Sequence, residues 1–232
     1  MLCRIADLIA EVPSTDGLDN RCRAYLQNGK AVPDIIIRNG SYRRDKYPSN
    51  TSDEVIAYME SAYQFYLKLI EHEGFYLHAS AVVRDGKAYL FSGFPGAGKS
   101  THARLWINTF GGDTRIINDD KPALRCIDGV WYAYGTPWCG KDGINLNEKA
   151  PVAGVCFVKK ADHNSIRKLP LHEAMIKILS QTIYLFDREQ SELFTKHLDS
   201  FLRSVPVFEL ENLPIPEAAM LSFETMFNEA NL

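Results

Sequence analysis

The chain has 232 residues, 46% of them hydrophobic, and a formal net charge of −3. A chain of this length can bury a substantial core without disulfide or metal staples. Acidic and basic residues are mixed along it, which argues against the broad basic surface used to bind nucleic acid or anionic lipid. We therefore expect a globular protein that binds neither nucleic acid nor membrane, and that holds any anion at a local site.

The cysteines indicate reduced thiols. Their number is odd, no Cys-x-x-C pair occurs, and no histidine stands at zinc-knuckle spacing from them. The N-terminal stretch MLCRIADLIAEV is too short and too interrupted by acidic residues for a signal peptide, and no apolar run approaches the roughly 18 residues of a membrane span. We therefore expect a cytoplasmic location. The cysteines are Cys3, Cys22, Cys126, Cys139 and Cys156.

Residues 1–50 contain short apolar segments without helical periodicity. RAYLQN and PDIIIRN are separated by Asn28–Gly29, and a second Asn-Gly pair stands at Asn39–Gly40. Asn-Gly between such segments is typical of a β-hairpin. We predict a small β-rich N-terminal lobe over 1–50, a polar linker at SYRRDKYPSNTSD, and a second domain over 51–232.

The second domain opens with an amphipathic helix. A Thr-Ser-Asp cap precedes EVIAYMESAYQFYLKLIEHEG, whose apolar residues recur at helical spacing until Gly74. The β-like runs FYLHASAVV and KAYLFSG then flank Asp85–Gly86, and PALRCI and VWYAYG flank Asp128–Gly129. Asp-Gly turns between such runs predict two antiparallel hairpins.

Helix and strand signals alternate through the rest of the domain. A helix is predicted from Lys99 to about Trp106, followed by a short strand, TRII. Further strands are predicted at VAGVCFVKK and VPVFELEN, and further helices at PLHEAMIKILSQTIY, SELFTKHLDSFLR and PIPEAAMLSFETMFNEA. Because hairpins occur on both sides of the glycine-rich stretch, we predict an α+β or mixed α/β fold in which helices flank a mixed sheet, and not a regular βαβ alternation.

The stretch FSGFPGAGKST fits the phosphate-loop template G-x-x-x-x-G-K-[ST] from Gly93 to Ser100. It follows an apolar strand and opens a helix, as the template requires. Glycines let backbone N–H groups surround phosphate oxygens, Lys99 reaches the β- and γ-phosphates, and the Ser100 hydroxyl ligates Mg²⁺. We predict ATP and Mg²⁺ as cofactors; the alternative is a glycine-rich turn that binds nothing. The expected nucleotide contacts are Gly93, Pro95, Gly96, Ala97, Gly98, Lys99, Ser100 and Thr101.

Two adjacent carboxylates follow the strand TRII. Phosphoryl transfer needs a carboxylate near the metal and a group that orients or deprotonates the acceptor. We assign Asp119 to the metal and Asp120 to the base role, while the residues leave open which takes which. The alternative is a solvated turn, because Asp and Asn are also ordinary turn residues.

Two further residues are candidates for catalysis. His78 lies in LHAS, on the strand expected to pair with the one that feeds the glycine-rich loop, and an imidazole suits proton handling near pH 7. Lys141 lies in the glycine-rich segment YGTPWCGKDGIN and is a candidate to neutralise charge on the transferred phosphoryl group. The alternatives are a structural histidine and an exposed turn lysine.

The order of these signals resembles the C-terminal catalytic domain of HPr serine kinase/phosphorylase, whose P-loop fold is shared with phosphoenolpyruvate carboxykinases. The resemblance implies an ATP-dependent kinase that acts on a serine of a protein or peptide. It places the family's loop lysine and metal-binding hydroxyl on Lys99 and Ser100, its strand histidine on His78, and its paired aspartates on Asp119 and Asp120. It also implies a homo-oligomer, since those kinases are hexamers.

The resemblance covers about residues 70 to 160. The bifunctional bacterial enzymes carry a glutamate where this chain has Thr101, their Arg-Gly-Leu-Gly signature is replaced by TPWCGKDG, and their late arginine-containing loop has no counterpart. The chain is more similar to the shorter HPr kinase-like proteins, some of which phosphorylate serine on a precursor peptide.

Three functions are therefore compared. The first is transfer of a phosphoryl group from MgATP to a serine hydroxyl of a protein or peptide. The second is a small-molecule kinase or carboxykinase-like enzyme on the same scaffold. The third is a regulatory or interaction module that binds ATP without turnover, which would not need the aspartates.

Overall fold

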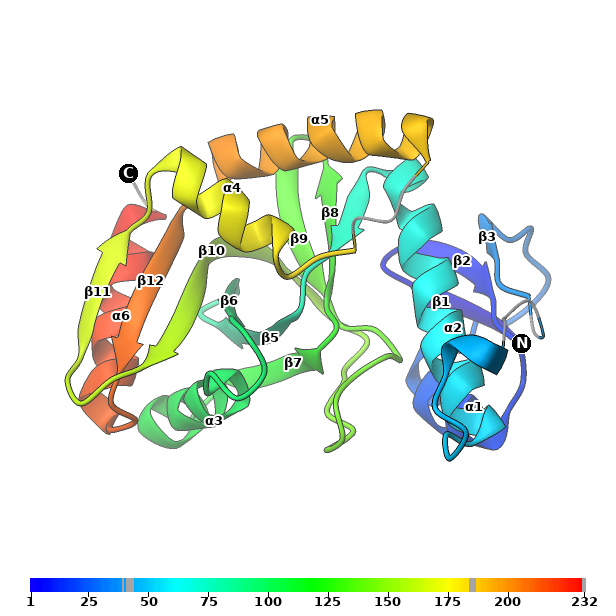
Figure 1. Ribbon diagram of the computed structural model, residues 1–232, viewed down its shortest axis with the longest axis horizontal. Coiled ribbons are helices and arrows are strands. Elements are labelled where there is room, and N and C mark those ends of the chain that lie inside the picture. The colour runs from blue at the N-terminus through cyan, green and yellow to red at the C-terminus, as the bar shows by residue number, and fades with distance from the viewer. Residues whose placement is uncertain (39, 41–43, 184–186, 231–232) are drawn as a thin grey trace.

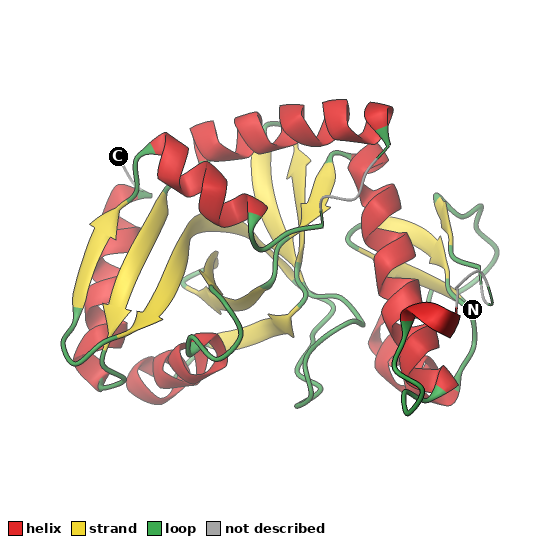
Figure 2. Ribbon diagram, in the orientation of Figure 1, coloured by secondary structure: helices red, strands yellow, loops and turns green. Residues whose placement is uncertain are grey.

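The computed structural model describes residues 1–38, 40, 44–183 and 187–230. Its centre is a curled, nine-stranded mixed sheet, and a separate three-stranded sheet lies at the N-terminal end of the molecule (Figure 1). Helices pack on both faces of the large sheet (Figure 2). The chain thus folds as a mixed α+β protein with flanking helices, as predicted. Within the described ranges, no helix is long and apolar enough to cross a membrane.

The large sheet runs in the order β4-β8-β9-β10-β6-β5-β7, and β12 pairs with both β10 and β11. The small sheet has the order β1-β2-β3. The strands are β1 (Leu2–Ile5), β2 (Leu8–Glu11), β3 (Ile35–Ile36), β4 (Gly74–Tyr76), β5 (Ala79–Arg84), β6 (Lys87–Ser92), β7 (Arg115–Asp120), β8 (Ala123–Ile127), β9 (Val130–Tyr134), β10 (Lys149–Lys160), β11 (Ser165–Lys168) and β12 (Val207–Asn212).

The long helices lie where apolar periodicity predicted them. Short 3-10 turns occur at Arg23–Tyr25, Arg44–Lys46 and Ile70–His72. The α-helices are α1 (Asp16–Cys22), α2 (Asp53–Leu69), α3 (Lys99–Phe110), α4 (Leu171–Leu179), α5 (Arg188–Ser204) and α6 (Pro216–Glu229).

Asp-Gly turns join both predicted hairpins. Asp85–Gly86 connects β5 to β6, and Asp128–Gly129 connects β8 to β9. The four residues have positive φ angles of 50°, 72°, 50° and 81°. Positive φ at both central residues characterises the turn whose twist matches that of antiparallel strands. Turn chemistry alone therefore predicted both pairings correctly.

The N-terminal lobe differs from the predicted hairpin. The turn between β1 and β2 is at Ala6–Asp7, and β3 pairs with β2 in parallel. RAYLQN is not a strand: it continues α1 into the 3-10 turn Arg23–Tyr25, where the Tyr25 ring is buried. The second Asn-Gly pair includes Asn39, which lies outside the described residues. Asn-Gly was misleading here because an isolated turn signal does not identify its partner strand.

Both faces of the large sheet are buried. Along β6, Ala88 and Leu90 belong to the core beneath α4 and α5, whereas Tyr89 and Phe91 belong to the core that contains α3 and α6. All four side chains are fully buried. A central strand covered on both sides is apolar on both faces, which explains why this stretch reads as one continuous apolar run.

The run FYLHASAVV forms two strands and not one. β4 pairs with β8, whereas β5 begins at Ala79 and pairs with β6 and β7. The chain changes partners at Leu77 and His78, where the His78 N–H donates to the Gln181 carbonyl at 2.7 Å. His78 therefore lies at the entry of β5.

The C-terminal part follows the predicted elements with two differences. The helix predicted at PLHEAMIKILSQTIY ends at Leu179, and its last predicted residue, Tyr184, lies outside the described residues. The strand β11 was not predicted, because SIRK is half polar and only Ile166 is partly buried.

Candidate functional site

The register of three strands brings the predicted residues to one edge of the sheet. β5 is antiparallel to both β6 and β7, and Ala79 lies opposite Ser92 on one side and Asp120 on the other. The start of β5 therefore meets the ends of β6 and β7. His78, the glycine-rich loop and the aspartate pair must converge at this edge.

The loop between β6 and α3 has a backbone that requires glycine. Gly93, Gly96 and Gly98 have φ angles of 144°, 79° and 105°, a region that side chains with a Cβ disfavour. A Cβ on Gly93 would also lie 3.0 Å from the Val158 carbonyl oxygen. Gly98 is the N-cap of α3 and supplies no side-chain acceptor, so the helix presents its first amides without a capping side chain. A helix N-terminus of this kind is suited to an anion.

The Lys99 side chain is folded back into this loop. Its Nζ donates to the Gly93 carbonyl oxygen at 2.9 Å, and the residue is buried. Burial lowers the pKa of Lys99, and the charges of Asp120 and Asp119 oppose that shift. The ammonium therefore lies within the glycine-rich loop.

Asp119 is the buried acceptor for two hydroxyl groups. Ser100 Oγ donates to Asp119 Oδ1 at 3.0 Å, and the Ser80 hydroxyl donates to the same oxygen. The buried carboxylate and the Ser100 hydroxyl are hard oxygen donors of the type that Mg²⁺ takes. In the part of the chain that the structure describes, no group of three or more His, Cys, Asp or Glu forms a metal cage. A Mg²⁺ held by one carboxylate together with substrate phosphates does not need one.

Asp120 lies between two basic side chains. His78 Nε2 is 2.8 Å from Asp120 Oδ1, and Lys121 pairs with the other oxygen. Burial favours the neutral acid, but the His78 hydrogen bond and the Lys121 charge outweigh it and hold the pKa of Asp120 well below its usual range. Asp120 also has a φ of 105°, an unusual angle for a residue other than glycine. The carboxylate is therefore ionised and fixed at the end of β7.

Gln181 holds the other side of the His78 ring. Its Oε1 lies 3.2 Å from His78 Nδ1, and its backbone carbonyl accepts from the His78 N–H. The imidazole thus bridges Gln181 and Asp120 and is fixed in orientation.

The segment between β9 and β10 is attached to the end of β7. The Gly140 N–H donates to the Asp119 carbonyl at 2.6 Å, and Asn118 Nδ2 donates to the carbonyl of Trp138 at 3.1 Å. A Cβ on Gly140 would lie 3.3 Å from the Asp119 carbonyl oxygen, so a glycine permits this approach. Lys141 follows directly. It is exposed and makes no hydrogen bond or ion pair with a described residue.

The structure brings most of the sequence-derived candidates together at this edge. The glycine-rich loop, Lys99 and Ser100 adjoin the aspartate pair, and His78 contacts Asp120 directly. Lys141 is in a neighbouring segment but does not contact the carboxylates. The Asp120 side chain is therefore not the solvated turn residue of the alternative interpretation, whereas Lys141 is exposed, as its alternative supposed.

Three polar residues at the site were not identified from the sequence. Ser80 lies within β5, two positions after His78, and Lys121 directly follows the aspartates, so proximity along the chain was an available signal. Gln181 comes from beyond α4, about a hundred residues from His78, and no local pattern indicated it.

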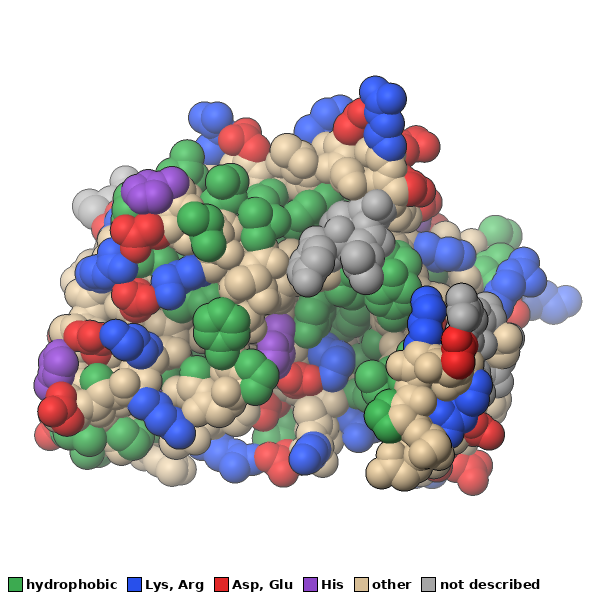
Figure 3. Space-filling view, in the orientation of Figure 1, with side chains coloured by type: hydrophobic (Ala, Val, Ile, Leu, Met, Phe, Trp, Pro, Cys, Tyr) green, Lys and Arg blue, Asp and Glu red, His purple; other side chains and the backbone are tan. Residues whose placement is uncertain are grey.

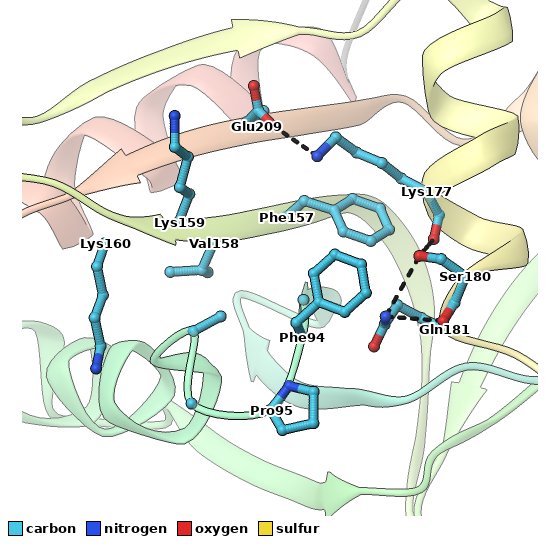
Figure 4. Close-up of a pocket in the computed structure, with 13 residues that line it drawn as sticks. Phe94, Pro95, Phe157, Val158, Lys159, Lys160, Lys177, Ser180, Gln181 and Glu209 are labelled. Carbon is cyan, nitrogen blue, oxygen red and sulfur yellow. Dashed lines mark hydrogen bonds and ion pairs between the residues drawn. The ribbon is translucent and has the colours of Figure 1, made fainter.

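A pocket of about 490 Å³ adjoins the loop (Figure 4). The first half of the loop forms one wall, the end of β10 forms the floor, and the C-terminal end of α4 with Gln181 forms the other wall. A smaller hollow of about 170 Å³ lies at the other end of the loop, beside Gly98 and Thr101.

Comparisons with known proteins leave the family open. No protein-family model matches the chain, and no curated protein matches it. Among solved structures, the HPr(Ser) kinase/phosphatase from Coxiella burnetii is similar with a TM-score of 0.39 and 14% sequence identity, over 66% of this chain and 97% of that chain. Because this TM-score is low, the functional proposal depends on the geometry of the site.

Proposed function

We propose that the protein is a P-loop serine kinase of the HPr kinase-like type, which transfers the γ-phosphoryl group of MgATP to a serine hydroxyl of a protein or peptide, precursor peptides included. The observation that carries this proposal is the convergence of two parts at one sheet edge. One part is a glycine-rich loop with a buried lysine, and the other is a pair of carboxylates in different environments.

The loop side would bind the nucleotide. Its amides and the Lys99 ammonium neutralise the β- and γ-phosphates, which is the main catalytic requirement of phosphoryl transfer. Ser100 and Asp119 would hold Mg²⁺. When bound, the ion neutralises charge that develops on the phosphate oxygens.

The carboxylate side would act on the acceptor. Asp120 takes the serine proton while the serine oxygen bonds to the γ-phosphorus, and the bond from that phosphorus to the β-phosphate oxygen breaks to release ADP. His78, held by Gln181, orients the Asp120 carboxylate. Lys141 is proposed to approach the transferred group from the adjoining segment.

Transfer of label from ATP tests the proposal. The protein is incubated with γ-labelled ATP, Mg²⁺ and serine-containing polypeptides, and the label is expected on phosphoserine. Label on a metabolite would indicate a small-molecule kinase instead. Nucleotide binding with no transfer would indicate a module without turnover.

Lys99→Ala tests whether the glycine-rich loop takes part in the transfer measured by this assay. We expect transfer to fall by about 10²- to 10³-fold, because a charge that acts on the transferred group is lost. The fold should persist, since the substitution removes a buried ammonium whose burial is unfavourable. Unchanged transfer in a folded Lys99→Ala protein would show that the loop is not catalytic.

A further inference from the structure

The two hollows lie at opposite ends of the glycine-rich loop and would correspond to the two ends of a bound triphosphate. In a P-loop, the lysine reaches the β- and γ-phosphates, whereas the helix start lies nearer the α-phosphate. The hollow of about 170 Å³ adjoins Gly98 and Thr101 at the helix start, and would face the nucleoside. The pocket of about 490 Å³ adjoins Gly93 and Pro95, and would face the group to be transferred.

Gln181 connects the larger pocket to the reaction centre. It lines the pocket wall, and its side chain contacts the His78 ring that orients Asp120. A polypeptide whose serine reaches Asp120 therefore has neighbouring residues within reach of the pocket, because each extended residue adds about 3.3–3.6 Å.

The pocket offers aromatic and aliphatic surface. Phe94 lines it from the loop, and Phe157 of β10 lies beneath it with only 4% of its surface exposed (Figure 4). Phe94 is 67% exposed although it is a large aromatic residue. Ile176 is 62% exposed, and it lies one helical turn before Ser180, which lines the pocket wall. In Figure 3, hydrophobic side chains gather on the face over α4.

The charged residues of the pocket leave one lysine unpaired, Lys160, which lines both this pocket and the smaller hollow. Lys177 pairs with Glu209 at 2.6 Å, and Lys159 pairs with Glu211 at 3.2 Å. Lys160 is exposed at the rim and has no hydrogen bond or ion pair with any residue that the structure describes. The pocket therefore carries excess positive charge next to its apolar walls.

We propose that this pocket is the specificity site for the acceptor, and that it takes a polypeptide segment with a large apolar side chain and a carboxylate near the reacting serine. The apolar side chain packs between Phe94 and α4, and the carboxylate pairs with Lys160. This inference rests on the proposed kinase function and names the substrate class of that site.

A degenerate peptide library tests the inference. Peptides with a central serine and three varied residues on each side are offered to the full-length protein, once with MgATP and once with MgADP. Phosphorylated peptides are sequenced from the first reaction and retained peptides from the second. Leu, Met or Phe together with Asp or Glu should be enriched in both pools, by about five- to tenfold over Ala and Lys.

Two substitutions assign the preference to the pocket. Phe94→Ala should remove the preference for large apolar residues, and Lys160→Glu should reverse the preference from acidic to basic residues. For each variant, the preference is measured as the ratio of phosphorylation or retention between two peptides. A change in nucleotide affinity affects both peptides equally and therefore cancels. Val32→Ala, at an 88% exposed position of the N-terminal lobe, and Lys196→Glu, on the exposed face of α5, should leave both ratios unchanged.

The outcomes distinguish a failure of the proposed peptide pocket from a failure of the proposed kinase function. Transfer without sequence preference, or a preference that Phe94→Ala and Lys160→Glu leave intact, overturns the inference while the kinase function stands. Selective retention without transfer supports the peptide pocket and contradicts the kinase function. A Phe94→Ala protein with weakened ADP binding and unchanged peptide ratios would show that the pocket holds the nucleoside, and would also overturn the inference. No selection in either pool overturns it as well.

Discussion

The two adjacent aspartates have different surroundings, and this difference supports the roles proposed for them. Asp119 is buried and accepts hydrogen bonds from two serine hydroxyls, whereas Asp120 is partly exposed and paired with His78 and Lys121. An inward-facing carboxylate with hydroxyl neighbours suits a metal. An exposed carboxylate with a fixed orientation suits an incoming hydroxyl.

We expect Asp120→Asn to lower kcat by about 10²- to 10⁴-fold with little change in ATP affinity, because the amide cannot accept the serine proton. Steady-state kinetics and nucleotide titration measure the two effects. Asp199→Asn, on the exposed face of α5, is the control. A loss confined to nucleotide affinity would remove the base role.

The lowered pKa of Asp120 determines the pH range over which its carboxylate is ionised. A carboxyl group whose pKa is lower in the folded protein stabilises the fold above its ordinary pKa near 3.9, and loses that contribution as the pH falls further. Asp120 is therefore ionised throughout pH 5–9. We expect the pH profile of kcat in this range to keep its shape in Asp120→Asn, at reduced height. A limb that disappears in the variant would show that Asp120 titrates there.

At the scale of residues, the sequence predicted the loop and the carboxylates because their chemistry is local. The spacing from Gly93 to Ser100 and the adjacency of Asp119 and Asp120 are visible in the chain itself. Gln181 could not be predicted, because its role depends on a tertiary contact with His78.

At the scale of elements, α3 is attached to the C-terminal part of the chain through a buried histidine. His102 Nδ1 lies 3.0 Å from Asn212 Oδ1, and Nε2 lies 3.0 Å from Ser222 Oγ. The Trp106 indole also donates to Ser222. The helix that carries the loop is thereby fixed to β12 and α6.

Because His102 is buried, we expect the protein to lose stability in mild acid. Burial lowers the pKa of His102 to about 4, and the hydrogen bond that its ring donates to the Asn212 amide oxygen opposes this shift. The unfolded chain then binds a proton below about pH 6.5 that the folded chain binds only near pH 4, so the free energy of unfolding falls across this window by about 3 kcal/mol. Urea unfolding from pH 7 to 4 measures it. In His102→Gln, this part of the pH dependence should vanish; an unchanged slope would contradict the assignment.

The proposed role of Lys141, in the segment between β9 and β10, can be tested by substitution. Lys141→Ala should lower kcat about tenfold and leave stability unchanged, because the side chain is exposed and its proposed role is confined to transfer. Lys196→Ala is the matched surface control. Equal kcat for the two variants would show that Lys141 is an ordinary exposed lysine.

The elements themselves were predicted to different degrees. Asp-Gly turns correctly predicted both hairpins, and helical periodicity predicted the long helices, because both signals are local in the sequence. The break at His78 could not be read from FYLHASAVV, because apolar residues continue through it. It results from β4 and β5 pairing with different strands.

At the scale of the whole molecule, the N-terminal lobe shares a core with the segment that adjoins the candidate site. Cys3 and Leu18 of the lobe belong to the same buried cluster as Trp138. The Trp138 ring packs on Phe65 of α2, and its indole donates to Ser61. The lobe therefore supports the segment that contacts Asp119. No sequence pattern indicated this, because the contact spans more than a hundred residues.

Trp138→Ala should lower both the stability of the protein and its kcat. We expect the free energy of unfolding to fall by about 3–5 kcal/mol, because a large buried aromatic residue leaves a cavity. We also expect kcat of the remaining folded protein to fall, since the segment beside Asp119 loses its support. Trp131→Ala, in the core beneath α5, should be comparably destabilised with an unchanged kcat. Equal kcat values in both variants would contradict this coupling.

A crystal structure with Mg²⁺ and a non-hydrolysable ATP analogue tests the central claim most directly. We predict phosphates against the amides of the glycine-rich loop, Mg²⁺ on Ser100 and Asp119, and the γ-phosphate between Lys99 and the Asp120 carboxylate. Nucleotide bound elsewhere, or a γ-phosphate directed away from Asp120, would contradict the account.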